Sequence, residues 1–310
     1  MTAVVWSIPM SDKQATAQPN FPYYQAYELD EDTRRSQSHY EQPVDFFYSL
    51  LGGEWHSYSS WLWPEGVTTE TAAQEAKLDL LARLMDLKPG QRILDVGCGW
   101  GGPLVYLCKN YGVSGVGLTV SPTQRVAIEE RIAKHGVDAR VIEQNWREFN
   151  DTAGFDAIYT DEVLVHFNDL GGFFKHCYDW LHEGGRMVHK ELHLTHPHWA
   201  ELDRAGNSVN ELYGLTGNYR TLAEELALAN AANFEVACVY NIPIAPHYMK
   251  TMERWLTNIR DNRQALEALV GPDTYRNYRR YLNVARAILI SRTMTLDVVA
   301  SQKLARVVKD

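Results

Sequence analysis

The stretch Gln91-Arg-Ile-Leu-Asp-Val-Gly-Cys-Gly-Trp-Gly-Gly102 decides the fold. Residues 93–96 have the apolar and β-branched character of a short buried strand, and a helical pattern begins at Leu104. The glycines between them let a ligand approach the backbone where a Cβ would block it. The free N–H groups at the start of the next helix face such a ligand. We therefore expect a ligand site at this turn.

The acid before the first glycine indicates which ligand this is. Phosphate-binding loops use the same geometry, but this stretch lacks the Lys-Ser/Thr ending of one kind and the full glycine spacing of the other. Asp95 would repel a phosphate and attract an ammonium or a hydroxyl group. An amino acid joined to a nucleoside carries both, and S-adenosylmethionine is such a molecule. The pattern resembles the first motif of class I methyltransferases.

Strand-like and helix-like segments alternate around this turn. Strands separated by helices imply a parallel sheet with helices on both faces, with ligands beyond the carboxyl ends of the strands. We expect an α/β, Rossmann-like class I methyltransferase fold whose mostly parallel sheet has seven strands. The predicted strands are 92–96, 114–119, 137–143, 155–159 and 186–194, then 234–239 and 300–308 as antiparallel additions; helices are predicted at 101–111, from Ser121, at 171–181 and over 248–287.

The segments outside this core are predicted to serve it. Residues 1–35, rich in Gln, Ser, Pro and acidic side chains, are expected to form a flexible N-terminal arm. A single methyltransferase domain would span 36–310. It would comprise an N-terminal helical cap (36–88), a cofactor-binding core (89–195), a lid and helical substrate-binding region (196–295) and the last strand (296–310). Within the cap, helices are predicted from Ser38 to Leu51 and from Thr69 to Leu87.

Composition narrows the functional class. The 310 residues carry a formal net charge of −9, which disfavours a general surface for nucleic acid. No stretch approaches the roughly 20 apolar residues that span a bilayer, and the first 20 residues lack a signal-peptide core. The sequence thus predicts a cytoplasmic protein that acts on a small-molecule substrate without stable membrane insertion. A homo-oligomer is compatible with the sequence.

A wider set of motifs is similar to one branch of the methyltransferases. Tyr58-Ser-Ser60, the glycine stretch and Leu118-Thr-Val-Ser-Pro-Thr-Gln124 resemble the cyclopropane fatty acid synthase-like enzymes, and the likeness runs from His39 to Lys303. The resemblance implies that S-adenosylmethionine is the cofactor. It implies that Tyr58 and Ser59 bind the methionine carboxylate and that Asp95, Gly97 and Gly99 lie along the methionine part. Thr119 and Gln124 would bind the ribose, and Asn145 and Trp146 would lie around the adenine. Asp161 would face the cofactor.

Two of these assignments have plainer alternatives. Trp146 offers a stacking face and Asn145 offers amide groups for the base edge. However, Trp146 also fits a core aromatic, and Ser59 also fits a turn residue.

The acceptor site departs from the cyclopropane synthases. That family keeps a Cys, a Glu, a His and a Tyr around a bound bicarbonate, which acts as the base. The resemblance puts Ser60 in place of the Cys and Val165 in place of the Glu, and retains His189 and Tyr248. The loss of the Glu removes the group that would orient bicarbonate, so we expect activity to be independent of that ion.

A different acid follows the fourth strand. Glu162 is placed as in geranyl diphosphate and sterol C-methyltransferases, which this chain resembles in carrying a Glu there. Methyl transfer to an alkene leaves a tertiary cation, which a carboxylate can stabilise and then deprotonate. We predict Glu162 as the base, His189 as a partner of Glu162 or of the substrate, and Tyr248 as a further catalytic residue. Aromatic faces would help by cation–π attraction, with candidates Trp61, Trp63, Tyr213 and Tyr219. Alternatively, Glu162 holds a loop or a cofactor hydroxyl.

The predicted acceptor is an isoprenoid alkene, in particular a prenyl diphosphate. Its phosphates would need cations, with Mg²⁺ as a companion, and we predict Lys190, Arg220 and Tyr213 as substrate-binding residues; Arg204, Lys250 and Arg254 are further cationic candidates. His189-x-Glu191-x-His193 is not predicted to bind a metal, because alternate positions on one strand rarely converge alone. The alternatives are an amine or aromatic natural product, a lipid alkene, and a non-catalytic cofactor-binding module.

Overall fold

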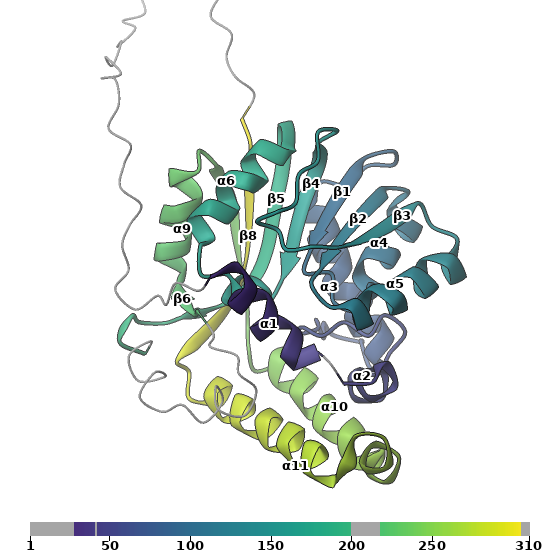
Figure 1. Ribbon diagram of the computed structural model, residues 1–310. Coiled ribbons are helices and arrows are strands. Elements are labelled where there is room, and N and C mark those ends of the chain that lie inside the picture. Colours follow the sequence, from purple (N-terminus) through teal and green to yellow (C-terminus); the bar gives the residue numbers. More distant parts are fainter. Residues whose placement is uncertain (1–27, 41, 200–217, 305–310) are drawn as a thin grey trace, which may run out of the picture.

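A sheet of eight strands forms the centre of the protein (Figure 1), with seven of them in one continuous path. The computed structural model describes residues 28–40, 42–199 and 218–304. The strand order is β3-β2-β1-β4-β5-β8-β7, in which β8 runs antiparallel to β5 and β7 and the others are parallel. The predicted fold class is thereby confirmed. The strands are β1 (Arg92–Val96), β2 (Ser114–Thr119), β3 (Ala139–Glu143), β4 (Phe155–Asp161), β5 (Leu181–Leu194), β7 (Glu235–Ile242) and β8 (Met294–Gln302), with the short β6 (Arg220–Thr221) paired to β5.

Helices cover both faces of the sheet, and each face buries its own apolar cluster. On one face lie α3 (Glu70–Met85), α4 (Gly102–Tyr111) and α5 (Pro122–His135). On the other lie α6 (Leu170–Trp180) and α9 (Leu222–Ala231), which pack against each other. Parallel strands need this double cover, because both of their faces are apolar.

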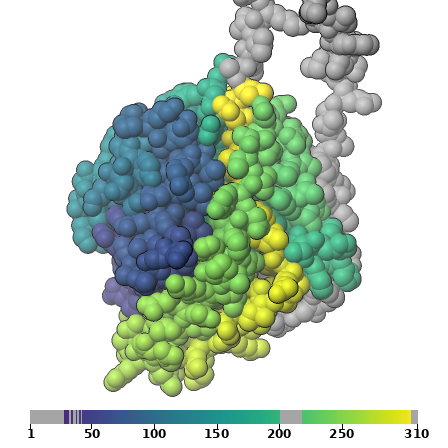
Figure 2. All heavy atoms as spheres, turned by 180° about the vertical axis from the view of Figure 1, so that it is seen from behind, coloured from purple at the N-terminus to yellow at the C-terminus, as the bar shows by residue number. Residues whose placement is uncertain are grey.

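A third group of helices lies beyond the carboxyl ends of the central strands. It comprises α2 (Val44–Leu51), α10 (Tyr248–Asp261) and α11 (Arg263–Ile290). Figure 2, seen from behind, shows light green atoms of the later part of the chain below the blue atoms. Phe46 of α2 packs against Tyr278 of α11, with ring centroids 4.6 Å apart. These helices therefore border the edge of the sheet where a ligand is expected.

The sequence signals for helix starts are found in the structure. Ser121 accepts a hydrogen bond from the backbone N–H of Gln124, and Pro122 stands at the first position of α5. Thr69 caps α3 in the same way through the N–H of Ala72. The cap at Ser121 fixes the start of α5 directly after the end of β2.

Several predicted boundaries were wrong. The arm predicted over 1–35 includes the start of α1 (Leu29–Tyr40), and the helix predicted from Ser38 is divided into α1 and α2, with Pro43 before α2. The last strand, predicted over 296–310 or 300–308, is β8, which starts earlier because Met294, Leu296 and Val298 face the core. The long helix predicted over 248–287 is two helices, and α11 kinks at Gly271, whose φ is 81°.

The segment predicted as a lid from residue 196 is only partly described. Residues 200–217, and with them Arg204 and Tyr213, lie outside the described residues. Beyond them the chain forms β6 and then α9, whose start is fixed by reciprocal hydrogen bonds between Thr221 and Glu224. The described end of this segment therefore belongs to the sheet and its helix layer. Within the described part of the chain, no helix is long and apolar enough to cross a bilayer.

Candidate active site

Two adjoining cavities open at the carboxyl ends of β1, β2 and β4. Tyr40, Gly97 and Gly99 line both. Every residue predicted to contact the cofactor lines one of them. Thr119, Asn145 and Trp146 line the first, Tyr58, Ser59, Asp95 and Asp161 line the second, and Gln124 joins the two glycines in lining both.

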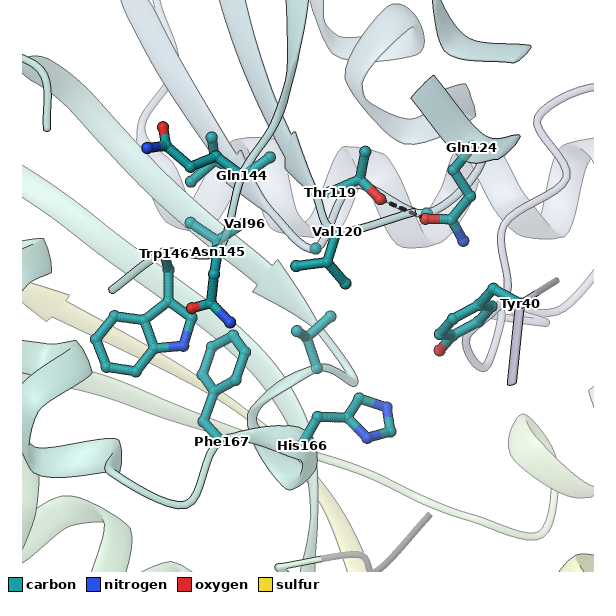
Figure 3. Close-up of a pocket in the computed structure, with 14 residues that line it drawn as sticks. Tyr40, Val96, Thr119, Val120, Gln124, Gln144, Asn145, Trp146, His166 and Phe167 are labelled. Carbon is teal, nitrogen blue, oxygen red and sulfur yellow. Dashed lines mark hydrogen bonds between the residues drawn. The ribbon is translucent and has the colours of Figure 1, made fainter. Parts of the chain in front are cut away.

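The first cavity has a flat aromatic wall and polar groups at its edge (Figure 3). The indole ring of Trp146 packs against Phe167, with centroids 5.5 Å apart, while Thr119 donates a hydrogen bond of 2.7 Å to Gln124 Oε1. Asn145 donates to the hydroxyl of Thr33 in α1 at 3.1 Å. A planar base with an attached sugar fits this combination of ring faces and hydrogen-bonding groups.

Two buried polar atoms of this cavity lack a partner among the described residues. They are Nε1 of Trp146 and Nδ1 of His166. Burial lowers the pKa of His166 to about 4, so its ring is neutral at neutral pH and can donate or accept one hydrogen bond at each nitrogen. Because buried polar groups are normally paired, a bound ligand is a natural partner for both. The sequence reading had not singled out His166.

The glycine turn separates the two cavities. Gly97 and Gly99 have φ values of 77° and 53°, which favour glycine. A Cβ at Gly97 would lie 2.6 Å from the side chain of Val163, whereas a Cβ at Gly99 would meet no protein atom within 4 Å. The side of Gly99 that a side chain would occupy is therefore open space in the cavity.

Asp95 lies at the end of β1 and is almost completely buried. The hydroxyl of Tyr159 donates to its Oδ2 at 2.5 Å. Burial raises the pKa of Asp95 to about 7, and the hydrogen bond from Tyr159 limits the rise. The carboxyl group is thus poised to ionise when a cation enters the second cavity.

Glu162 is held by donors from three separate parts of the chain. Its Oε1 accepts hydrogen bonds from the N–H of Ser60 at 2.8 Å, from the Ser60 hydroxyl at 2.7 Å and from the ammonium of Lys190. Its Oε2 accepts one from the hydroxyl of Tyr248 at 2.6 Å. Glu162 and Tyr248, both predicted as catalytic residues, therefore lie in hydrogen-bond contact.

Four charged side chains alternate in sign across the site: Lys77, Asp161, Lys190 and Glu162. Lys77 lies 2.5 Å from Asp161 Oδ2, Lys190 lies 2.7 Å from Asp161 Oδ1, and Lys190 also pairs with Glu162. Burial alone would raise the pKa of Asp161, but Lys190 and Lys77 outweigh it and lower that pKa to about 2. The cluster therefore contains two positive and two negative groups.

The prediction that His189 is the partner of Glu162 was wrong. In the register of β4 and β5, Thr160 pairs with His189 and Asp161 pairs with Lys190. Directly paired residues point to the same face, so Lys190 meets the acidic end of β4 and His189 points to the opposite face. There His189 Nε2 lies 2.8 Å from Glu225 of α9. Lys190, predicted to bind substrate, occupies the place that was assigned to His189.

Other predicted contacts also lie elsewhere. Arg220 is buried and donates to the backbone carbonyls of Leu164, Phe167 and Asn218, so it holds the turn η1 (Leu164–His166) beside the first cavity. Trp61 donates its indole N–H to the carbonyl of Ser57, and Trp63 donates its own to Thr251. Both tryptophans belong to the core, whereas Tyr40 and Tyr58 provide the aromatic faces that line the second cavity.

Lys77, like His166, was missed by sequence reasoning. It lies on the inner face of α3 between Ala73 and Leu81, and its side chain is completely buried. A lysine in the middle of an apolar helical stripe is the signal that could have revealed it, since lysine is almost never fully buried unless it is paired. Among the described residues no group of three or more His, Cys, Asp or Glu is arranged to hold a metal ion.

Comparison with known proteins identifies the family. The sequence model of the mycolic acid cyclopropane synthetase family matches residues 27–299. The chain belongs to this family. It is 28% identical over 263 residues to the hydroxymycolate synthase MmaA4 of Mycobacterium tuberculosis, covering 79% of this chain and 84% of that protein. It is 30% identical over 262 residues to the S-adenosylmethionine-dependent methyltransferase UmaA of the same organism, covering 80% and 89%.

The structural likeness is equally extensive. The mycolic acid cyclopropane synthase CmaA1, solved with SAH and CTAB, superposes with a TM-score of 0.80 at 25% identity, over 87% of this chain and 98% of that one. The predictions of the family, of an S-adenosylmethionine-dependent methyltransferase and of its cofactor are thereby confirmed.

Proposed function

We propose that this enzyme transfers the methyl group of S-adenosylmethionine to an alkene carbon of a lipid acceptor, with Glu162 as the base. The observation that carries the proposal is the position of the Glu162 carboxylate. It lines the same cavity as Asp95 and the glycine turn, at the carboxyl end of β4. The acceptor and the chemistry at Glu162 are the proposed parts.

The cofactor would span both cavities. The first suits its adenosine, between Trp146, Asn145 and the Thr119–Gln124 pair, and the second suits its methionine part beside Asp95 and Ser59. The sulfur atom joins these two parts of the molecule, so it belongs where the cavities meet, at Gly97 and Gly99. This placement puts the reactive methyl group on the side of the site that Glu162 lines.

The chemistry then follows from charge. When the alkene attacks the methyl group, the C–S bond breaks, the sulfonium becomes a neutral thioether and the acceptor becomes a carbocation. A carboxylate beside that cation lowers its free energy and accepts the proton that leaves as the new double bond forms. Oε2 of Glu162 has Tyr248 as its one partner among the described side chains, so it retains a lone pair for that proton.

The described residues do not support a prenyl diphosphate as acceptor. No lysine or arginine is among the described residues that line the two cavities. The cations proposed for a diphosphate are occupied elsewhere: Arg254 pairs with Glu70 at 3.1 Å, and the ammonium of Lys250 lies 4.2 Å from the ring centre of Trp63. A lipid alkene needs no such charge, and the relatives MmaA4 and CmaA1 are named for mycolic acids, which are lipids.

An acceptor screen tests the proposal. Purified enzyme with S-adenosylmethionine would be offered unsaturated acyl lipids, prenyl diphosphates and amines in parallel, with adenosylhomocysteine formation and product mass as readouts. We expect turnover with an unsaturated lipid and a mass gain of one methylene unit. Turnover confined to a prenyl diphosphate or to an amine would overturn the acceptor class.

The role of Glu162 has its own test. Glu162→Gln keeps the shape of the side chain but removes its charge and basicity, so single-turnover rates should fall about 10²- to 10⁴-fold. Cofactor affinity measured by calorimetry should change little. A structural Glu162 would show the opposite pattern, with weakened cofactor binding or a lower melting temperature and an almost unchanged rate.

A further inference from the structure

Lys77 is a buried cation that no part of the proposed chemistry uses. Its side chain is completely inaccessible, on the α3 face that packs against the sheet. Placing an ammonium ion in such a position is costly unless it is paired and fully hydrogen-bonded. The structure meets both conditions. All three of its ammonium hydrogens have acceptors, namely Ser57 Oγ, Ser59 Oγ at 2.8 Å and Asp161 Oδ2 at 2.5 Å.

These contacts connect Lys77 to the reacting groups. Ser59 also donates to Asp161 Oδ2 at 2.6 Å, so Lys77, Ser59 and Asp161 form a closed triangle at the wall of the second cavity. Asp161 in turn contacts Lys190, and Lys190 contacts Glu162. Lys77 therefore lies at the opposite end of the charged cluster from Glu162 and does not itself line either cavity.

The charge balance of the cluster depends on Lys77. With Lys77 present, two ammonium groups face two carboxylates. Without it, Lys190 would be the one ammonium group of this cluster beside Asp161 and Glu162, whose side chains are 9% accessible. Asp95 and Glu191 also act on the cluster, and burial raises the pKa of Asp95 to about 7 and that of Glu191 to about 8. A buried excess negative charge is relieved by taking up a proton, so one carboxyl group of the cluster would stay protonated at neutral pH.

We propose that Lys77 is a positioning residue that keeps Asp161 and Glu162 ionised together and fixes Ser59 at the methionine end of the cofactor. It acts on Glu162 through Asp161 and Lys190. The inference rests on the proposed function in one respect, since the effect on turnover requires Glu162 to be the base. The effect on proton binding does not depend on that role.

Lys77→Met tests the proposal, because Met has similar length and no charge. The acid limb of the kcat profile should move to higher pH, and kcat at pH 7 should fall about tenfold or more. In addition, calorimetric titration with S-adenosylmethionine in two buffers of different ionisation enthalpy counts the protons exchanged. The variant should release more protons per bound cofactor than the parent protein, because a cation displaces the extra proton.

A matched pair of variants separates charge from structure. Lys77→Met/Asp161→Asn removes one charge of each sign, so its acid limb and proton count should return toward those of the parent protein. Lys88→Met, at an exposed lysine whose side chain is 66% accessible, should change neither. If Lys77→Met does not fold, the double variant carries the test alone, and a shifted acid limb in it overturns the proposal.

The outcomes distinguish this inference from the proposed function. Near-parental turnover of Glu162→Gln would remove Glu162 as base, yet an increased proton release by Lys77→Met would still support the charge balance. A folded Lys77→Met with an unchanged acid limb and an unchanged proton count would overturn it, leaving Lys77 with a packing role only.

Discussion

Replacing Glu162 by glycine should convert the enzyme into one that depends on an added small anion. The four donors around the carboxylate belong to Ser60, Lys190 and Tyr248 and remain in place. Because the φ of residue 162 is 59°, glycine fits its backbone at no steric cost. The variant should therefore leave a carboxylate-sized space lined by unsatisfied donors, which formate or bicarbonate can occupy.

The size of the effect follows from the lost groups. Loss of the base should slow turnover about 10²- to 10⁴-fold, which is about 2.7 to 5.5 kcal/mol of barrier. Each buried donor left without an acceptor costs about 1 to 3 kcal/mol, offset by about 1 to 2 kcal/mol from relief of the left-handed backbone. A bound anion at a hundred times its dissociation constant returns about 2.7 kcal/mol to the folded state.

Two assays measure how Glu162→Gly responds to an added anion. Turnover of Glu162→Gly should rise with formate or bicarbonate to a plateau, and its melting temperature should rise over the same concentration range. Parent protein in the same buffers controls for general salt effects, and chloride controls for ionic strength. A folded Glu162→Gly that shows neither a saturable rate increase nor an anion-dependent melting temperature would refute the reasoning.

Three further outcomes are expected. The parent enzyme should work equally well in degassed and in bicarbonate-supplemented buffer, since Glu162 already occupies the donors; a several-fold stimulation would contradict this. Gly99→Val should abolish cofactor binding in calorimetry while circular dichroism shows a folded sheet, because the side chain would project into the cavity. Unchanged affinity would place the cofactor elsewhere. Because burial raises the pKa of Asp95 to about 7, cofactor affinity should rise from about pH 6 to pH 8 as the carboxyl ionises, and Asp95→Asn should remove this dependence. The stability of the protein without cofactor should change with pH in the opposite direction to cofactor affinity. The raised pKa of Asp95 stabilises the folded state at low pH, and this stabilisation is lost as the pH rises through 7.

The central strands were predictable from the sequence because they are buried on both faces. β2 was predicted over 114–119 and has those bounds, since continuous apolar runs between glycines and helix caps leave little choice. α1 was not predicted, because its sequence is polar throughout. Gln37 donates to the carbonyl of Val120 at 2.6 Å, and Thr33 accepts from Asn145. Contacts of this kind join residues that are far apart in the sequence, so the local sequence pattern does not predict them.

Three of the four charged residues of the site were predicted from the sequence, Lys77 being the exception, but their pairing was not. Strand alternation indicated that His189, Glu191 and His193 share one face, and His189 and His193 both reach Glu225. Which face meets Glu162 depends on the register of β4 against β5, where a shift by one residue exchanges His189 for Lys190. The sequence of either strand does not specify that register, so His189 was assigned the place that Lys190 occupies.

The backbone at Glu162 bears on the plainer alternative, in which this side chain merely holds a loop. A residue other than glycine with φ of 59° costs about 1 to 2 kcal/mol, and a loop at this position would be more stable with glycine. The cost is offset because hydrogen bonds to a charged group contribute about 1.5 to 3 kcal/mol each, and the carboxylate accepts four. With glycine at position 162, these donors would have no carboxylate to bind. In the structure they hold the carboxylate so that Oε2 and Tyr248 lie together at the cavity. The strained backbone and the converging donors are both accounted for if what this position supplies is the carboxylate itself.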